Sequence, residues 1–196
     1  SVAPRITYDS NQSLREARKR YFETNHFGDD GGYSKKWVPL ELGPIKFAIP
    51  NTPGRVKAVR YHDLHHIVTG YQTDWIGEFE ISAWEVASSC RDFAAAWILN
   101  LSGLAAGICV APRRISRAFI RGRHSRNLYP DTFNDSLLDA EVGATRQRLG
   151  LDAAATGSPT DWLALLAWVL TGMLMIAGVL AATLGPLVFI VMLLWP

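Results

Sequence analysis

The chain has 196 residues, a formal net charge of +2 and 48% hydrophobic residues, so it can hold one domain with a real core and a small addition. A charge this close to neutral does not favour nucleic acid as a bulk partner, and we expect none. The cysteines, Cys90 and Cys109, both have apolar neighbours. They support neither a disulfide framework nor a thiolate metal site, and we expect buried thiols.

The N-terminal segment, residues 1–52, is predicted to form a helix and then a more extended stretch. The run Ser13-Leu-Arg-Glu16 has the pattern of a capping box and predicts a helix that ends near Asn25. Apolar residues later alternate with polar or small ones over 38–49, which predicts a small β-hairpin interrupted by Gly43-Pro44.

A helix with two histidines at metal-binding spacing is predicted next. Thr52-Pro53 is a favourable N-cap and first-turn pair, so this helix should begin there and end at Gly70. Within it, His62 and His66 lie four residues apart on one face, the spacing with which two imidazoles grip one cation. Asp63 falls in the same arc, either as a fourth ligand or as a carboxylate that orients a histidine.

A second helix should begin near Thr73 or Asp74 and continue to about Trp97. The turn between the two helices would bring Glu78 back toward the histidine face. Two imidazole nitrogens and up to two carboxylates would then surround one point, which is the arrangement of a metal site with open coordination positions.

The predicted metal ligands, which are also the candidate catalytic residues, are His62, Asp63, His66 and Glu78. Such a set is typical of catalytic rather than closed structural metals. Zinc, iron, cobalt or manganese can occupy it, and the sequence does not choose among these divalent ions. His65 points away from His62 on a helical wheel, so we expect it to pack or hydrogen-bond elsewhere.

The wider sequence around this site resembles the Coq-four family of ubiquinone biosynthesis proteins. Members of that family carry His-Asp-x-x-His, then eleven residues, then Glu, and the four candidate ligands match this pattern without a gap. The flanks are similar at Arg60-Tyr61, Thr69-Gly70, Thr73, Gly77 and Trp84-Glu85. A weaker likeness continues through Gly122 to Leu151, whereas the first fifty residues and everything after Leu151 depart from the family.

This resemblance implies a polyprenylated aromatic substrate and a reaction in which a ring carboxylate is lost and a hydroxyl is gained. The metal would act as a Lewis acid on the phenolic oxygen or the carboxylate and would stabilise charge that develops on the ring.

The apolar stretch 93–111 is interrupted by Asn100 and Ser102 and stopped by Pro112. Because the corresponding region belongs to the folded domain in the Coq-four family, we expect a buried central helix. A membrane span is the alternative, although its length is borderline. Gly103 and Gly107 would allow another helix to approach closely.

A basic cluster follows that helix. Its candidate membrane-surface residues are Arg113, Arg114, Arg117, Arg121 and Arg123. They are interleaved with Ile115, Phe119 and Ile120, the pattern of an amphipathic helix on anionic lipid. A solvated helix face explains the same pattern equally well. A further helix is predicted over 134–149, with Gly150 at its end.

The end of the chain has the composition of a membrane tail. From Trp162 to Trp195 there is no charged residue, and 162–183 is long enough for one crossing. Gly185-Pro186 is expected to break the helix. The last ten residues, 187–196, would be a short return leg, a kinked continuation or a segment against a partner's membrane helices. A buried core helix is the disfavoured alternative.

The predicted fold class is therefore mainly α, with a compact helical domain and a small hairpin near 38–49. The predicted segments are 1–52, the metal-motif domain 53–151, a linker 152–161 and a tail 162–196 that forms a transmembrane helix or a helical hairpin. Because the arginines precede the tail, we expect the domain to face the cytoplasm. The start, Ser-Val-Ala-Pro, has no export signal, so we expect a bacterial inner membrane.

Two functions fit these observations. The first is a tailoring enzyme of quinone biosynthesis, a metal-dependent oxidative decarboxylase that meets membrane lipid and a prenylated quinone or its precursor. The second is a non-catalytic accessory subunit of a larger electron-transfer or photosynthetic membrane complex, whose tail packs against partner helices.

Overall fold

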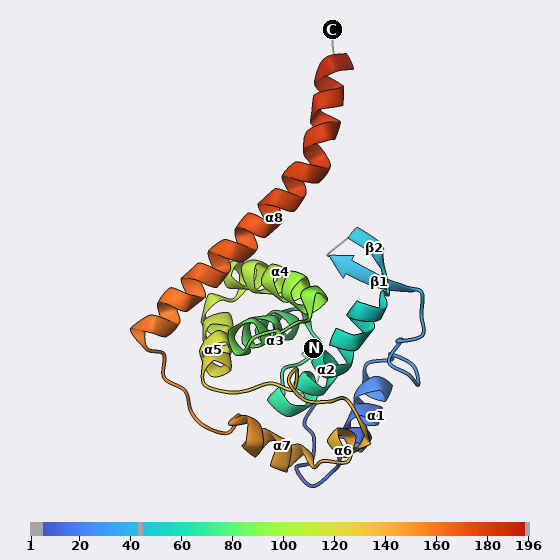
Figure 1. Cartoon of the computed structure of the whole chain (residues 1–196), viewed down its shortest axis with the longest axis vertical. Helices are drawn as coiled ribbons and strands as arrows, with labels where there is room; N and C mark the ends of the chain where they lie inside the picture. Colours follow the sequence, from blue (N-terminus) through green and yellow to red (C-terminus); the bar gives the residue numbers. More distant parts are fainter. Residues whose placement is uncertain (1–5, 43–44, 195–196) are drawn as a thin grey trace.

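The computed structural model describes residues 6–42 and 45–194 and confirms a mainly α-helical chain with one small hairpin. The elements of these residues are α1 (Leu14–Thr24), β1 (Trp37–Leu42), β2 (Ile45–Pro50), α2 (Pro53–Thr69), α3 (Trp75–Ser88), α4 (Ala94–Val110), α5 (Pro112–Arg123), α6 (Asp135–Leu138), α7 (Val142–Leu149) and α8 (Pro159–Leu194). Helices α2 to α5 form the body, α1, α6 and α7 lie at one end, and α8 leaves the body as a long rod (Figure 1).

The start of the chain folds as its local sequence predicts. The hydroxyl of Ser13 accepts from the Glu16 N–H at 3.2 Å, and the Glu16 carboxylate accepts from the Ser13 N–H at 3.0 Å, which completes the capping box of α1. The two strands pair antiparallel, with Trp37 opposite Pro50. The predicted interruption at Gly43-Pro44 lies outside the described residues.

Helix α2 begins and ends where predicted, which fixes the position of the two histidines. The Thr52 side chain accepts from the Arg55 N–H at 3.2 Å, and Pro53 occupies the first turn. Gly70 has a φ of 77°, a left-handed conformation that glycine adopts without steric cost, and its N–H donates to the carbonyl of His66.

The second predicted helix is in fact two helices, which corrects the expectation of one helix to about Trp97. Helix α3 ends at Ser88, because Ser89 and Arg91 have φ values of 79° and 49° that an α-helix cannot contain. The side-chain amide of Asn127 donates to the carbonyls of Ser88 and Ser89 and stabilises this turn. The chain can therefore reverse and pack α4 against α3.

Helix α4 is not the buried central helix that the sequence suggests. One side packs on α3, and the other side is exposed, with Val110 65% accessible. The predicted close approach is confirmed: a Cβ added to Gly107 would lie 2.6 Å from Phe79 Cβ, and one added to Gly103 would collide with the Ser82 hydroxyl. Helix α4 is therefore a surface helix that is apolar on both sides.

Helix α5 turns its apolar residues into the domain. Ile115 and Phe119 are completely buried, and Ile120 is nearly so. Core packing against α3 thus explains the apolar half of the amphipathic pattern, and these side chains are not free to enter lipid.

The arginines of α5 divide into two groups. Arg114 binds both oxygens of the Glu80 carboxylate, Arg121 donates to the carbonyl of Thr69, and Arg123 donates to a carboxylate at the start of α8. Arg113 and Arg117 are exposed, and among the described residues neither has an ion pair or a side-chain hydrogen bond. Only these two remain available to a surface outside the molecule.

The helix predicted over 134–149 is interrupted at residues 139–141, giving α6 and α7. The backbone there hydrogen-bonds to the N-terminal segment instead: the Leu14 N–H donates to the Ala140 carbonyl and the Val142 N–H to the Gln12 carbonyl, each at 2.9 Å. Gly150, with a φ of 74°, ends α7 as predicted.

Helix α8 continues through Gly185-Pro186 to Leu194, so the predicted break is wrong. Proline removes one backbone hydrogen bond but does not by itself end a helix whose neighbours stay helical. Of the alternatives for the end of the tail, the backbone up to Leu194 agrees with a continuation of the helix. Only 17% of the most apolar part of α8 is buried, which excludes a buried core helix.

The domain has two hydrophobic clusters. One joins α1, α2 and the segment around α6 and α7. The other joins α3, α4 and α5 and includes Leu165 and Val169 from the first half of α8. Cys90 lies buried in the first cluster, as expected, whereas Cys109 is exposed because it lies on the outward side of α4.

Candidate metal centre

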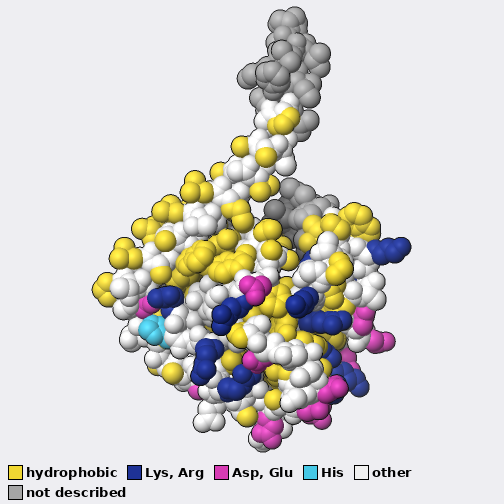
Figure 2. All heavy atoms as spheres, in the orientation of Figure 1, with side chains coloured by type: hydrophobic (Ala, Val, Ile, Leu, Met, Phe, Trp, Pro, Cys, Tyr) yellow, Lys and Arg dark blue, Asp and Glu magenta, His cyan; other side chains and the backbone are white. Residues whose placement is uncertain are grey.

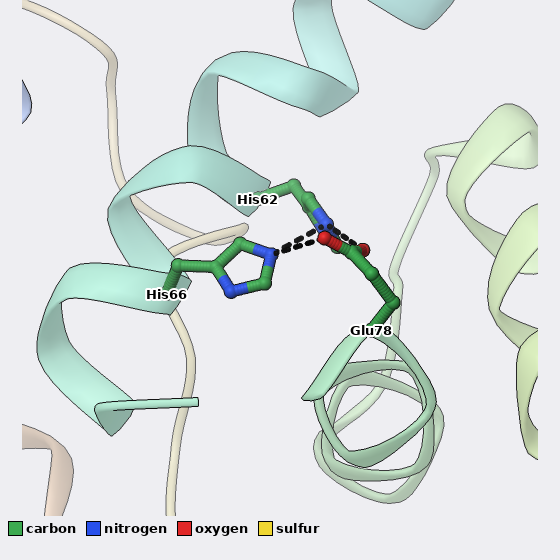
Figure 3. A group of neighbouring side chains, drawn as sticks. All are labelled: His62, His66 and Glu78. Atoms are coloured by element: carbon green, nitrogen blue, oxygen red, sulfur yellow. Dashed lines mark hydrogen bonds and ion pairs between the residues drawn. The ribbon is translucent and has the colours of Figure 1, made fainter. Parts of the chain in front are cut away.

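Two histidines of α2 and one glutamate of α3 point toward one another (Figure 3). His62 Nε2 lies 3.2 Å from His66 Nε2 and 3.5 Å from a Glu78 oxygen, and His66 Nε2 lies 3.4 Å from the other Glu78 oxygen. A tetrahedral ion with bonds of about 2.0–2.1 Å keeps its ligands about 3.3–3.4 Å apart. The two nitrogens and the two oxygens of Glu78 therefore converge closely enough that the three side chains could hold a small divalent cation.

The second ring nitrogen of each histidine has a partner that fixes the tautomer. His66 Nδ1 lies 2.9 Å from the carbonyl oxygen of Tyr71, which can only accept, so Nδ1 carries the proton. His62 Nδ1 lies 2.8 Å from a Glu85 oxygen and donates to it in the same way. In the neutral form of each ring, Nε2 therefore carries the lone pair, on the side of Glu78, as metal ligation requires.

Glu85 is the residue that the sequence interpretation left without a role. It is completely buried, and one oxygen accepts from both His62 and His65, at 2.8 and 2.7 Å. The other oxygen accepts from the Tyr129 hydroxyl at 2.6 Å and from the Asn100 amide. A buried carboxylate with four donors orients the His62 ring. Glu85, and not Asp63, is therefore the carboxylate that orients a histidine of the site.

Spacing alone contains the signal for Glu85. It follows Glu78 by seven residues, which is two helical turns, so both carboxylates share the face of α3 that meets α2. The resemblance to the Coq-four family pointed to Trp84-Glu85 as a pair but assigned it no chemistry.

The remaining candidate, Asp63, lies outside the group of converging donors. It is buried, and its carboxylate accepts from the Tyr33 hydroxyl. Tyr21 of α1 stacks on the His66 ring with 5.7 Å between centroids and forms another wall of the site. His65 hydrogen-bonds elsewhere, as expected: its Nδ1–H donates to Glu85, and its Nε2 accepts from a backbone N–H.

The charges in the site shift the pKa values of His62 and Glu78 in opposite directions. Burial by itself lowers the pKa of His62, but the carboxylates of Glu85 and Glu78 outweigh it and raise this pKa well above its usual range. Burial likewise raises the pKa of Glu78, yet the two histidines more than offset this and hold it far below its usual range. Glu78 therefore stays an anion and gives the site the negative charge that a cation needs.

The centre is accessible from the side of Glu78. The His66 side chain is 1% accessible, whereas that of Glu78 is 43% accessible. A ligand can therefore reach the ion position past Glu78, while His66 forms the closed back of the site.

A separate pocket of about 670 Å³ lies beside the start of α2. Its walls include Tyr61, Phe93, Tyr129 and Phe133, with Lys57 at its edge. Because the Tyr129 hydroxyl also donates to the carboxylate that holds His62, one chain of hydrogen bonds connects this pocket with the metal centre.

No protein-family model, curated protein or solved structure gives a significant match to the chain. Two features are shown by the structure alone. The His62, His66 and Glu78 group can hold a metal ion, and the described residues include one helix that is long and apolar enough to cross a membrane.

Proposed function

We propose that this protein is a metal-dependent membrane protein of the Coq-four type that acts on a polyprenylated aromatic precursor of a quinone. The observation that carries the proposal is the convergence of two imidazole nitrogens and a carboxylate from a His-x-x-x-His helix and its neighbour. Two imidazoles and one carboxylate leave open positions on a divalent ion, as catalytic metals require.

The proposed reaction replaces a ring carboxylate with a hydroxyl. The bond from the ring to the carboxyl carbon breaks and carbon dioxide leaves, a bond from the ring carbon to an oxygen of water forms, and an acceptor such as a quinone takes two electrons together with the protons that the water and the carboxyl group release. The metal would supply Lewis acidity toward the phenolic oxygen or the carboxylate. His62, His66 and Glu78 hold the ion, and Glu85 keeps the His62 ring in place.

The proposed location is a bacterial cytoplasmic membrane with the domain on the cytoplasmic side. Support comes from the absence of charged residues in α8 after Asp161 and from the arginines that precede α8 in the sequence. A membrane position would place the centre beside a substrate whose long isoprenoid chain is insoluble in water.

The decisive experiment is elemental analysis of the full chain purified in mild detergent. We expect about one zinc, iron, cobalt or manganese ion per chain and its loss in His66→Ala, because His66 supplies one of three ligands. His26→Asn is the matched control: His26 is exposed with a φ of 57°, a conformation that asparagine tolerates. Metal retained in His66→Ala, or lost equally in both variants, would contradict the proposal.

A second candidate function is an accessory subunit of a larger membrane complex. Helix α8 favours it, because the rod extends well beyond the domain that it touches (Figure 1). This candidate predicts stoichiometric membrane partners in the purified sample and no carboxylated precursor in cells carrying His66→Ala. Accumulation of that precursor supports the enzyme instead.

A further inference from the structure

Helix α8 is joined to the domain along its first half. Leu165 and Val169 are buried in the cluster of α3, α4 and α5, and the Trp168 ring stacks on Trp97 of α4 with 5.1 Å between centroids. At Gly172 the two helices come so close that an added Cβ would lie 2.6 Å from the carbonyl oxygen of Leu101. Wherever the first half of α8 lies, α4 must lie beside it.

The helix segment that is long and apolar enough to cross a membrane, Pro159–Pro186, includes this docked half of α8. The first half also carries Leu163, Leu166 and Leu170 on its outward side, each at least half exposed. A crossing that uses the uncharged run from Trp162 therefore brings the docked half, and α4, into the apolar layer.

The outward side of α4 has the composition that lipid requires. Ile98 and Leu99 are 58% and 43% accessible, and the helix contains no charged residue. In Figure 2, hydrophobic side chains gather along α8 and the adjoining α4, while the charged side chains lie on the opposite part of this face. The two helices thus form one continuous apolar surface, named here the α4–α8 surface.

The hydroxyls on the α4–α8 surface are satisfied within their own helices. Ser102 donates to the Ile98 carbonyl at 2.9 Å, Thr171 to the Ala167 carbonyl at 2.8 Å and Thr183 to the Val179 carbonyl at 2.9 Å. A hydroxyl that faces hydrocarbon has no water to bind, so it needs such a partner.

The ends of this surface carry the groups found at membrane boundaries. Directly after α4 come Pro112 and the exposed Arg113 and, one turn later, Arg117, so the uncharged stretch ends there. Trp162, half exposed, stands at the start of the apolar run of α8, as aromatic residues do at membrane interfaces.

We propose that the protein is partly embedded: α4 enters the bilayer with α8, and the α4–α8 surface contacts lipid acyl chains. This inference rests on the proposed membrane location of α8. It adds that the folded domain itself sits in the membrane, so that the candidate metal centre is held against the bilayer rather than on a free stalk.

Depth measurements with spin labels test the inference in the full chain. A nitroxide is attached to Ala106→Cys, an exposed position of α4, in a Cys109→Ala background and in vesicles of phosphatidylcholine with phosphatidylglycerol. Leu180→Cys reports the α8 span, and Lys19→Cys on α1 reports water. We expect oxygen to reach the label at 106 and a charged nickel complex to be excluded, with a ratio several-fold above that at 19 and similar to that at 180.

Each other outcome overturns the inference in a distinguishable way. A lipid-like label at 180 with a water-like label at 106 means that α8 crosses without α4. Water-like labels at both positions remove the span and, with it, the proposed membrane location. A label at 106 shielded from both reagents means that a partner protein covers the surface.

A second measurement needs no change in α4. In vesicles, the native exposed Cys109 should react with a lipid-soluble maleimide and resist a charged one, whereas equal reaction with both would contradict embedding.

Discussion

At the scale of single residues, Glu85 connects the candidate metal centre with the interior of the domain. Glu85→Gln keeps the shape but removes the negative charge and replaces one of the two acceptor oxygens with a donor, although both oxygens face donors in the wild type. Breaking a buried charged network of this kind costs about 3 kcal/mol or more of stability. Loss of an orienting partner lowers metal affinity by roughly 10- to 100-fold. Denaturant unfolding and metal titration measure the two effects.

Glu80→Gln is the matched control for this change. Glu80 lies on the same helix and pairs with Arg114, whose side chain is 42% exposed. Partly exposed pairs contribute about 0–1 kcal/mol, and Glu80 does not contact the candidate ligands. An equal loss of metal in the two variants would show that Glu85 acts only through general stability.

Metal capture should weaken as the pH falls, because an imidazole binds metal only in its neutral form. The nearby carboxylates raise the pKa of His62 well above its usual range despite its burial. Protons therefore compete with the metal even above the ordinary histidine pKa of about 6.5. Lower pH protonates His62 and releases the ion, and higher pH frees the nitrogen. We expect the apparent zinc affinity to rise between about pH 5 and pH 8 in a chelator competition assay. A flat profile would exclude imidazole ligands.

Much of the centre follows from the sequence at this scale. The spacing of His62 and His66 places both on one helical face, and that is local geometry. The approach of Glu78 depends on the turn at Gly70, whose left-handed conformation glycine favours. The seven-residue spacing from Glu78 places Glu85 on the same face of α3, whereas the position of Asp63 outside the centre goes with its tertiary contact to Tyr33, which local sequence does not predict.

At the scale of elements, the close contact of α3 with α4 depends on glycines, which have no side chain to separate the two helices. Gly107→Ala would place a Cβ 2.6 Å from Phe79 Cβ, close to the α3 backbone, where little adjustment is available. Overpacking of this kind costs about 1–3 kcal/mol and exceeds the roughly 1 kcal/mol that alanine gains over glycine in a helix. We expect a lower unfolding temperature in detergent. Gly54→Ala in α2, where nothing lies within 4 Å, should leave it unchanged or raise it slightly.

Helix ends were predictable where the signal is local and were missed where it is tertiary. Ser13, Thr52 and Gly150 mark helix ends through their own side chains or conformations, and all three lie where predicted. The turn after Ser88 instead depends on Asn127, which is far away in the sequence. The interruption before α7 likewise depends on backbone hydrogen bonds to the N-terminal segment.

At the scale of the whole molecule, α8 is both a candidate membrane helix and part of the domain. A chain ending at residue 158 would uncover the part of α4 that contains Trp97 and Leu101. We expect this truncated chain to aggregate without detergent and to melt at a lower temperature than the full chain, because a buried face becomes exposed. Size-exclusion chromatography and thermal melting measure both effects.

A chain ending at Ile176 is the matched control. It keeps the buried positions of α8 up to Gly172, and the removed residues whose burial is described, 177–186, are all exposed. Its melting temperature in detergent should equal that of the full chain, while its retention in vesicles after an alkaline wash should fall. If both truncations melt alike, the docked half of α8 contributes nothing to the fold.

The fixed tautomer of His65 has a further consequence. Its Nδ1–H donates to a fully buried carboxylate at 2.7 Å, and its Nε2 accepts from the Leu128 N–H at 3.0 Å. Burial therefore keeps this proton from exchanging with water, and the two hydrogen bonds keep the ring from rotating. Such a proton should give an isolated, far-downfield, slowly exchanging signal in a proton magnetic resonance spectrum. Because it exists only when residues 65, 85 and 128 are assembled, that one line would report native folding of the domain before any substrate is known.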